Sequence, residues 1–175
     1  MCSLETLKID LKGLKEVEAT CEYDLDDQFF AALDGSQLEH GSLHVLVSIR
    51  KMSGFFDLSF HTEGTVTVSC DRCLDDMEQP IEADNHLVVR LGDTYSEDDD
   101  TVTIDENEGI LDASWFVYEF VMLAIPIKHV HAPGKCNSAM TQKLEELSGA
   151  VRSGEEEAEA IDPRWEKLRE LNIKD

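Results

Sequence analysis

The strongest pattern in the chain is an alternation of apolar and polar residues over positions 43–91. An apolar residue occupies every second position from Leu43 to Ile49, and the alternation returns from Phe56 to Phe60 and again after Gly64. A period of two is typical of strands with one buried face. We therefore expect two or three antiparallel strands, followed by a strand over 78–91 that returns from a hairpin turn containing Cys70-Asp71-Arg72-Cys73.

Helical signals flank this sheet. The segment 113–125 is almost wholly apolar, is preceded by Asp112 and is closed by Pro126, which predicts a buried helix. Acidic residues at 24–27 precede an apolar stretch at 29–33, which predicts a short helix. A weaker helix is expected over 139–150, and Asp162-Pro163 begins a short terminal helix with Trp165 on its apolar face.

The chain length of 175 residues fits one domain with a tail. The predicted fold class is α+β, with an antiparallel β-sheet that carries the C-x-x-C hairpin turn and packs against the buried helix and the short helices. We expect residues 1–150 to form this single domain and residues 151–175 to form a linker and the short C-terminal helix.

Acidic residues dominate the charge. The chain has 15 Lys plus Arg against 38 Asp plus Glu, a formal net charge of −23, which opposes binding to a phosphate backbone through bulk charge. No Lys or Arg occurs between Leu91 and Ile127. We expect residues 93–109 to be a mobile acidic loop, either simply solvated or able to attract a basic partner such as a ribosomal protein.

Two features of the sequence bear on where the protein is located. No run of 18 apolar residues occurs, and the first residues lack the basic and apolar regions of a signal peptide, so a cytoplasmic protein without membrane contact is expected.

Five cysteines are an odd number in a chain that needs no crosslinks for its core, which favours reduced thiols or a metal over a disulfide framework.

Four residues could form a metal site of three thiols and one imidazole. Cys70 and Cys73 place two sulfurs on one turn, and the segment after the buried helix supplies His131 and Cys136, with His129 as the alternative imidazole. A Cys₃His set is typical of structural zinc. The alternative is that Cys70 is a small buried apolar residue and the other side chains are incidental.

Catalysis has no positive support in the sequence. Asp71, Asp75 and Asp76 flank the C-x-x-C, whereas reactive thiols lie beside cations or helix N-termini. There is no nucleophile elbow, glycine-rich phosphate loop or H-E-x-x-H motif. We therefore expect a protein that is not an enzyme and has no small-molecule substrate.

Local nucleic-acid contact would depend on few residues. The cations near the predicted sheet and its turn are Arg72, Arg50, Lys51 and Arg90. Each of them is also explained as an ordinary soluble surface residue.

The order of these motifs resembles the YceD family of bacterial proteins, the large ribosomal RNA subunit accumulation proteins, a domain of unknown function. The matching segments are Ser69-Cys70-Asp71-Arg72-Cys73-Leu74, then an acidic segment, Glu119 leading to Leu123-Ala124-Ile125-Pro126, Val130-His131 with Cys136, and Asp162 to Leu168. The resemblance covers roughly residues 40–172 and implies a role in accumulation of large-subunit (23S) ribosomal RNA.

Three functions therefore stay open from the sequence. The first is a non-enzymatic ribosome biogenesis factor that contacts ribosomal RNA or a ribosomal or assembly protein. The second is a zinc-stabilised protein-interaction module whose acidic loop engages a basic partner without RNA contact. The third, an oxidoreductase using Cys70 and Cys73, is the least favoured because the surrounding charges are acidic.

Overall fold

The computed structural model describes residues 2–3, 7–98 and 101–152 of the chain. The predicted terminal helix with Trp165, and nearly all of the predicted linker, lie outside these residues. By its internal contacts the chain divides into a unit of residues 1–130 and a unit of residues 131–175.

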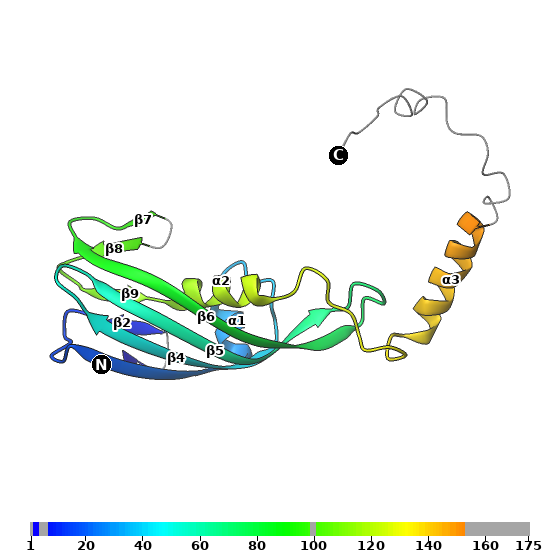
Figure 1. Cartoon of the computed structure of the whole chain (residues 1–175), viewed down its shortest axis with the longest axis horizontal. Helices are drawn as coiled ribbons and strands as arrows, with labels where there is room; N and C mark the ends of the chain where they lie inside the picture. Colours follow the sequence, from blue (N-terminus) through cyan, green and yellow to red (C-terminus); the bar gives the residue numbers. More distant parts are fainter. Residues whose placement is uncertain (1, 4–6, 99–100, 153–175) are drawn as a thin grey trace, which may run out of the picture. The chain divides into compact units, whose positions relative to one another are not determined.

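A six-stranded sheet forms the larger part of the first unit (Figure 1). Its strand order is β3-β4-β5-β6-β8-β7, and every neighbouring pair is antiparallel except β6 and β8. The strands are β3 (Glu18–Leu25), β4 (Gly41–Lys51), β5 (Phe56–Ser69), β6 (Asp76–Gly92), β7 (Ser96–Asp98) and β8 (Thr101–Asp105). The α+β class is confirmed, with a mixed sheet that is mostly antiparallel.

Strand β5 continues through the point where the sequence suggested two separate strands. Gly64 makes this continuity possible, because its φ of 143° lies in a region that side chains rarely adopt. A Cβ at this position would lie 2.2 Å from the carbonyl oxygen of Ser42 on β4. The glycine therefore lets two long strands approach closely without interrupting their pairing.

A second, three-stranded sheet has the order β1-β2-β9. Its strands are β1 (Cys2–Ser3), β2 (Lys8–Asp10) and β9 (Ile110–Asp112), all paired antiparallel. Ile9 and Leu111, which are partners in the β2–β9 register, are both buried and join the main core. This sheet therefore belongs to the same hydrophobic core as the large one.

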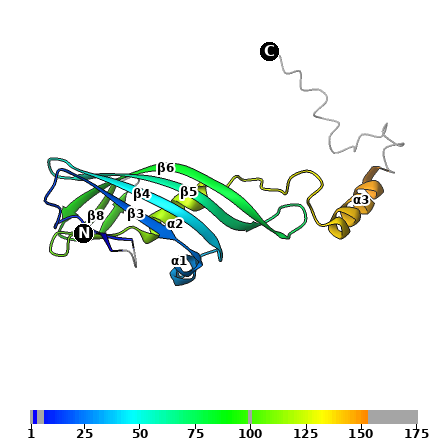
Figure 2. The same ribbon diagram turned by 90° about the horizontal axis from the view of Figure 1, so that it is seen from below.

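Two helices contribute to that core, α1 (Asp27–Ala32) and α2 (Ser114–Ala124), both seen beside the sheet in Figure 2. Asp26 caps α1 by accepting a hydrogen bond from the Gln28 amide at 2.9 Å. Helix α2 packs on the sheet with the rings of Phe120 and Phe60 5.5 Å apart. The expectation of a buried helix at 113–125 holds for one face only, since Leu123 is 80% exposed.

The segment 93–109, expected as an acidic loop, contains strands β7 and β8 instead. Val102 and Ile104 alternate with polar residues and are buried, which is the pattern of a strand with one face in the core. This strand, β8, pairs in parallel with the end of β6. The density of carboxylates in the sequence hid this short alternation. The charges themselves stay exposed on β7, at the edge of the sheet.

The second unit contains helix α3 (Ser138–Arg152), close to the helix expected over 139–150. The Ala139 amide donates to the Asn137 side-chain oxygen at 3.0 Å in the first turn. Among the described residues, no helix has both the length and the apolar character needed to cross a membrane.

Candidate metal centre

The C-x-x-C sequence lies in the connection between β5 and β6, whose last paired residues are Ser69 and Asp76. The Cys70 amide donates to the Asp75 carbonyl, and the Leu74 amide donates to the Cys70 carbonyl, both at 2.9 Å. Cys70 continues the inward phase of β5 and is fully buried, as the alternation predicted. Leu74 has a φ of 63° and is 68% exposed, an unusual conformation for a leucine.

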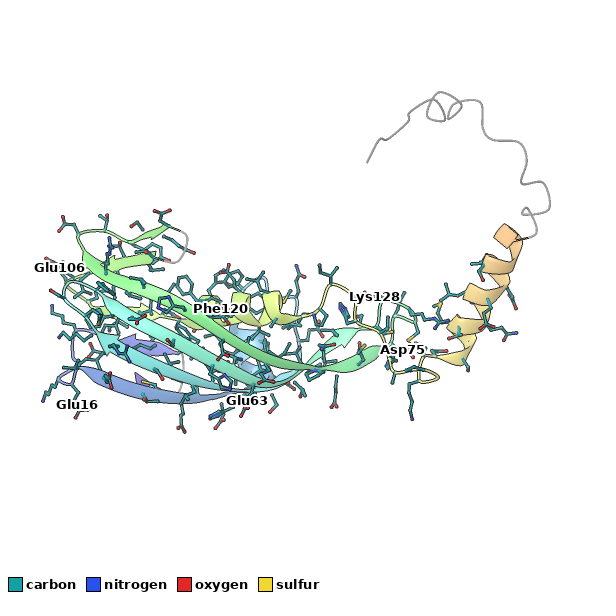
Figure 3. The ribbon with its side chains drawn as sticks, viewed as in Figure 1. Glu16, Glu63, Asp75, Glu106, Phe120 and Lys128 are labelled. Atoms are coloured by element: carbon teal, nitrogen blue, oxygen red, sulfur yellow. The ribbon has the colours of Figure 1, made fainter. Side chains whose placement is uncertain are left out.

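The segment after α2 is fastened to this connection by two backbone contacts. The Asp71 amide donates to the His129 carbonyl at 3.0 Å, and the His129 amide donates to the Asp71 carboxylate at 2.8 Å. In Figure 3, Lys128 and Asp75 lie at the same end of the sheet. The chain therefore reaches His131, two residues further on, beside the two cysteines.

The four predicted donors come together. One ligand atom from each of Cys70, Cys73, His131 and Cys136 lies within 4.8 Å of every other. Zinc–sulfur bonds of about 2.3 Å place the ligands of a tetrahedral ion about 3.8 Å apart, so these atoms need only small shifts to hold one. Both turn cysteines are buried, while His131 and Cys136 are half-buried. Three thiols and an imidazole are a zinc donor set, and the residues fit the ion.

The family model described as large ribosomal RNA subunit accumulation protein YceD matches residues 58–172. The chain belongs to the YceD family. No curated protein and no solved structure matches the chain. The YceD match contains all four donors of the cluster, so the candidate metal centre lies inside the family region.

His129, the alternative imidazole, is used differently in this YceD chain. Its Nδ1 lies 2.9 Å from the Pro126 carbonyl oxygen, and its Nε2 lies 3.6 Å from the Asp71 carboxylate. These contacts hold the segment against the β5–β6 connection. His129 therefore positions the segment after α2, and His131 is the histidine that belongs to the cluster.

The cysteines are in two states. Cys70, Cys73 and Cys136 are reduced thiols, as expected, whereas Cys21 is disulfide-bonded, which the expectation of reduced thiols did not include. Cys21 lies on β3 and belongs to the buried core. Among the cysteines whose state the structure describes, the three outside disulfides are therefore the three in the candidate metal centre.

The four cations proposed for nucleic-acid contact do not form one patch. Lys51 and Arg90 belong to the end of the sheet where β5 begins, because Lys51 pairs with Phe56 and Arg90 follows the partner of Phe56 on β6. Arg72 follows the other end of β5, a strand of 14 residues that is about 45 Å long. Arg50 pairs with Glu18 at 3.1 Å, and the Lys51 ammonium lies 5.7 Å from the centre of the Phe56 ring.

Sequence reasoning missed a set of histidine–carboxylate pairs. His44 contacts Asp24 at 2.8 Å and His61 contacts Asp84 at 2.7 Å, each across neighbouring strands. These hydrogen bonds raise the pKa of both histidines, and Asp27 raises the pKa of His40 in the same way. The His44–Asp24 and His61–Asp84 pairs depend on strand register, which the sequence does not reveal.

Proposed function

We propose that this chain is a non-enzymatic factor in ribosome biogenesis, which supports accumulation of large-subunit (23S) ribosomal RNA in the cytoplasm. The observation that carries the proposal is the YceD family match over residues 58–172. The absence of a catalytic motif in the sequence agrees with a role in assembly rather than in chemistry.

We propose further that Cys70, Cys73, His131 and Cys136 hold a zinc ion with a structural role. Four protein ligands would complete a tetrahedral site and leave no position for a substrate. A bound ion would join the β5–β6 connection to the segment that begins at His131. Its binding free energy would then add to the free energy of folding.

Contact with the assembling ribosome is proposed to occur chiefly through protein. The net charge of −23 repels RNA, and Arg72 is about 45 Å of strand away from Lys51 and Arg90. The alternative is a short RNA contact through Arg72. A salt titration with RNA tests it, because the affinity for RNA must fall as the salt concentration rises. Binding that survives nuclease treatment favours the protein-contact version, whether or not it weakens with salt, because contact between an acidic chain and a basic protein is also screened by salt.

The test is deletion of the gene, followed by gradient analysis of ribosomal particles and of 23S precursors. We expect fewer mature large subunits, restored by the wild-type gene and by His129→Asn, but restored poorly by His131→Asn at elevated temperature. An unchanged gradient in the deletion strain would contradict the ribosomal role. Equal restoration by both variants would contradict the contribution of the metal centre.

A further inference from the structure

The strongest unassigned feature is a cavity of about 420 Å³ where β7, β8 and β9 meet the beginning of α2. It lies far along β6 from the cysteines, since β8 pairs with residues 88–92 of β6 whereas the C-x-x-C precedes residue 76. The volume falls in the range of ligand-binding pockets. None of the four candidate metal ligands lines this cavity.

The floor of the cavity is apolar and its rim carries two exposed aromatic rings. Ile104, Leu111 and Phe116 supply buried apolar surface. On the rim, Tyr95 is 61% exposed and Trp115 is 43% exposed. Solvent-exposed rings beside an apolar floor can hold an aliphatic stem with a cation at its end.

Carboxylates complete the rim. Glu97, Asp105, Glu108 and Asp112 line the cavity, and Glu119 accepts a hydrogen bond from the Trp115 indole at 2.8 Å. Burial raises the pKa of the Tyr95 phenol, and its hydrogen bond to Glu97 and the charge of Glu119 raise it further. The ring is therefore neutral, and negative charge surrounds it.

No cation of the described chain neutralises these carboxylates through an ion pair. Lys8 is the register partner of Asp112, but the two form no ion pair. Lys12 donates to the backbone carbonyls of Glu106 and Asn107 at 3.0 and 3.2 Å. The four carboxylates that line the cavity thus outnumber the two nearby cations, Lys8 and Lys12, and the rim keeps a net negative charge beside two aromatic rings.

We propose that this cavity binds a lysine or arginine side chain from a basic protein segment. The stem would lie on the apolar floor, and the cationic head would meet the rings of Tyr95 and Trp115 and the rim carboxylates. RNA does not fit this chemistry because its phosphates are repelled by the same carboxylates. A second copy is disfavoured because each chain carries a net charge of −23.

The test uses the fluorescence of Trp115 in the full chain carrying Trp165→Phe, which leaves a single tryptophan of the original two. The probe is acetyl-Gly-Arg-Gly-Arg-Gly-amide at physiological salt, and its control replaces both arginines with neutral citrulline. We expect the arginine peptide to change the Trp115 emission saturably. The citrulline peptide should bind at least tenfold more weakly, because it has the same shape without the charge.

Variants separate the pocket from the general charge of the protein. Tyr95→Leu should weaken arginine-peptide binding about two- to fivefold, while Tyr95→Phe, which keeps the ring, should restore it. Glu97→Gln with Glu108→Gln should weaken it at least fivefold. The matched control, Glu22→Gln with Glu82→Gln, removes the same charge from other strands of the large sheet and should change affinity less than twofold.

Several outcomes would overturn the proposal. One is equal weakening by the matched control, which would reduce the effect to bulk charge. Others are an unchanged Trp115 signal, unchanged binding by folded Tyr95→Leu, or displacement of the peptide by an RNA oligonucleotide. Dimerisation that is lost in Tyr95→Leu would assign the cavity to a second copy instead.

Discussion

Replacing His131 and His129 separately provides the sharpest test of the candidate metal centre. The two imidazoles are two residues apart, but only His131 belongs to the cluster of four donors. His129 contacts the Pro126 carbonyl and Asp71, and its backbone bonds to Asp71 do not need the imidazole. We therefore expect His131→Asn to lose metal and His129→Asn to retain it.

The size of the effect follows from linkage. At a free zinc concentration about 1,000 times the Kd, a bound ion adds about 4 kcal/mol to the free energy of unfolding. Changes to residues that merely support a ligand already cost 10–100-fold in affinity, so loss of a ligand should cost about 100-fold or more. The remaining stabilisation is then about 1.4 kcal/mol. The loss of about 2.7 kcal/mol lowers the Tm by roughly 5–11 °C.

The assay combines elemental analysis with thermal unfolding, with and without a chelator. Wild type and His129→Asn should contain one zinc per chain and should lose stability with the chelator, whereas His131→Asn should respond little. For His129→Asn the loss of one side-chain hydrogen bond accounts for about 0.5–1.5 kcal/mol, less than the loss of the metal. Cobalt substitution should add thiolate-to-cobalt absorption in the wild type. Metal-free wild-type protein with a chelator-insensitive Tm, or equal metal content in both variants, would refute the reasoning.

Two further predictions concern the sheet. Gly64→Ala should lower the free energy of unfolding by about 3 kcal/mol or more in chemical denaturation, because its Cβ would meet β4 backbone at 2.2 Å. Gly35→Ala, with open space around it, should cost only about 1 kcal/mol. The raised pKa values of His44 and His61 stabilise the fold below about pH 6.5 and lose this effect as pH rises through the folded-state values. His44→Gln with His61→Gln should therefore flatten the fall in Tm between pH 6 and 9, and an unchanged slope would contradict the assignment.

The sequence predicted the features that depend on local patterns. The alternation at 43–49 corresponds to β4, and the apolar segment before Pro126 corresponds to α2. The metal donors could be grouped because thiols and imidazoles are few, so the choice of partners was small. The sequence placed His131 in the set and kept His129 as the alternative, and the contacts that give His129 a different role, with Asp71 and Pro126, depend on the fold.

Features that depend on long-range pairing were missed. Strand β8 has only two buried apolar residues, Val102 and Ile104, and forms because the end of β6 offers an unpaired edge. The pair His61–Asp84 joins residues 23 positions apart, which only the β5–β6 register brings together. Charge density was a poor guide to structure here, because carboxylates exclude burial of their own side chains but not of the residues between them.

The candidate metal centre and the aromatic cavity are built from different residues. Strand β6 has the C-x-x-C connection before its first residue and β8 beside its last five, and its 17 residues span about 55 Å. Helix α2 likewise begins at the cavity and leads to the segment that carries His131. None of the four candidate metal ligands lines the cavity. Failure of zinc binding would therefore leave the cavity proposal intact, and failure of peptide binding would leave the zinc centre intact.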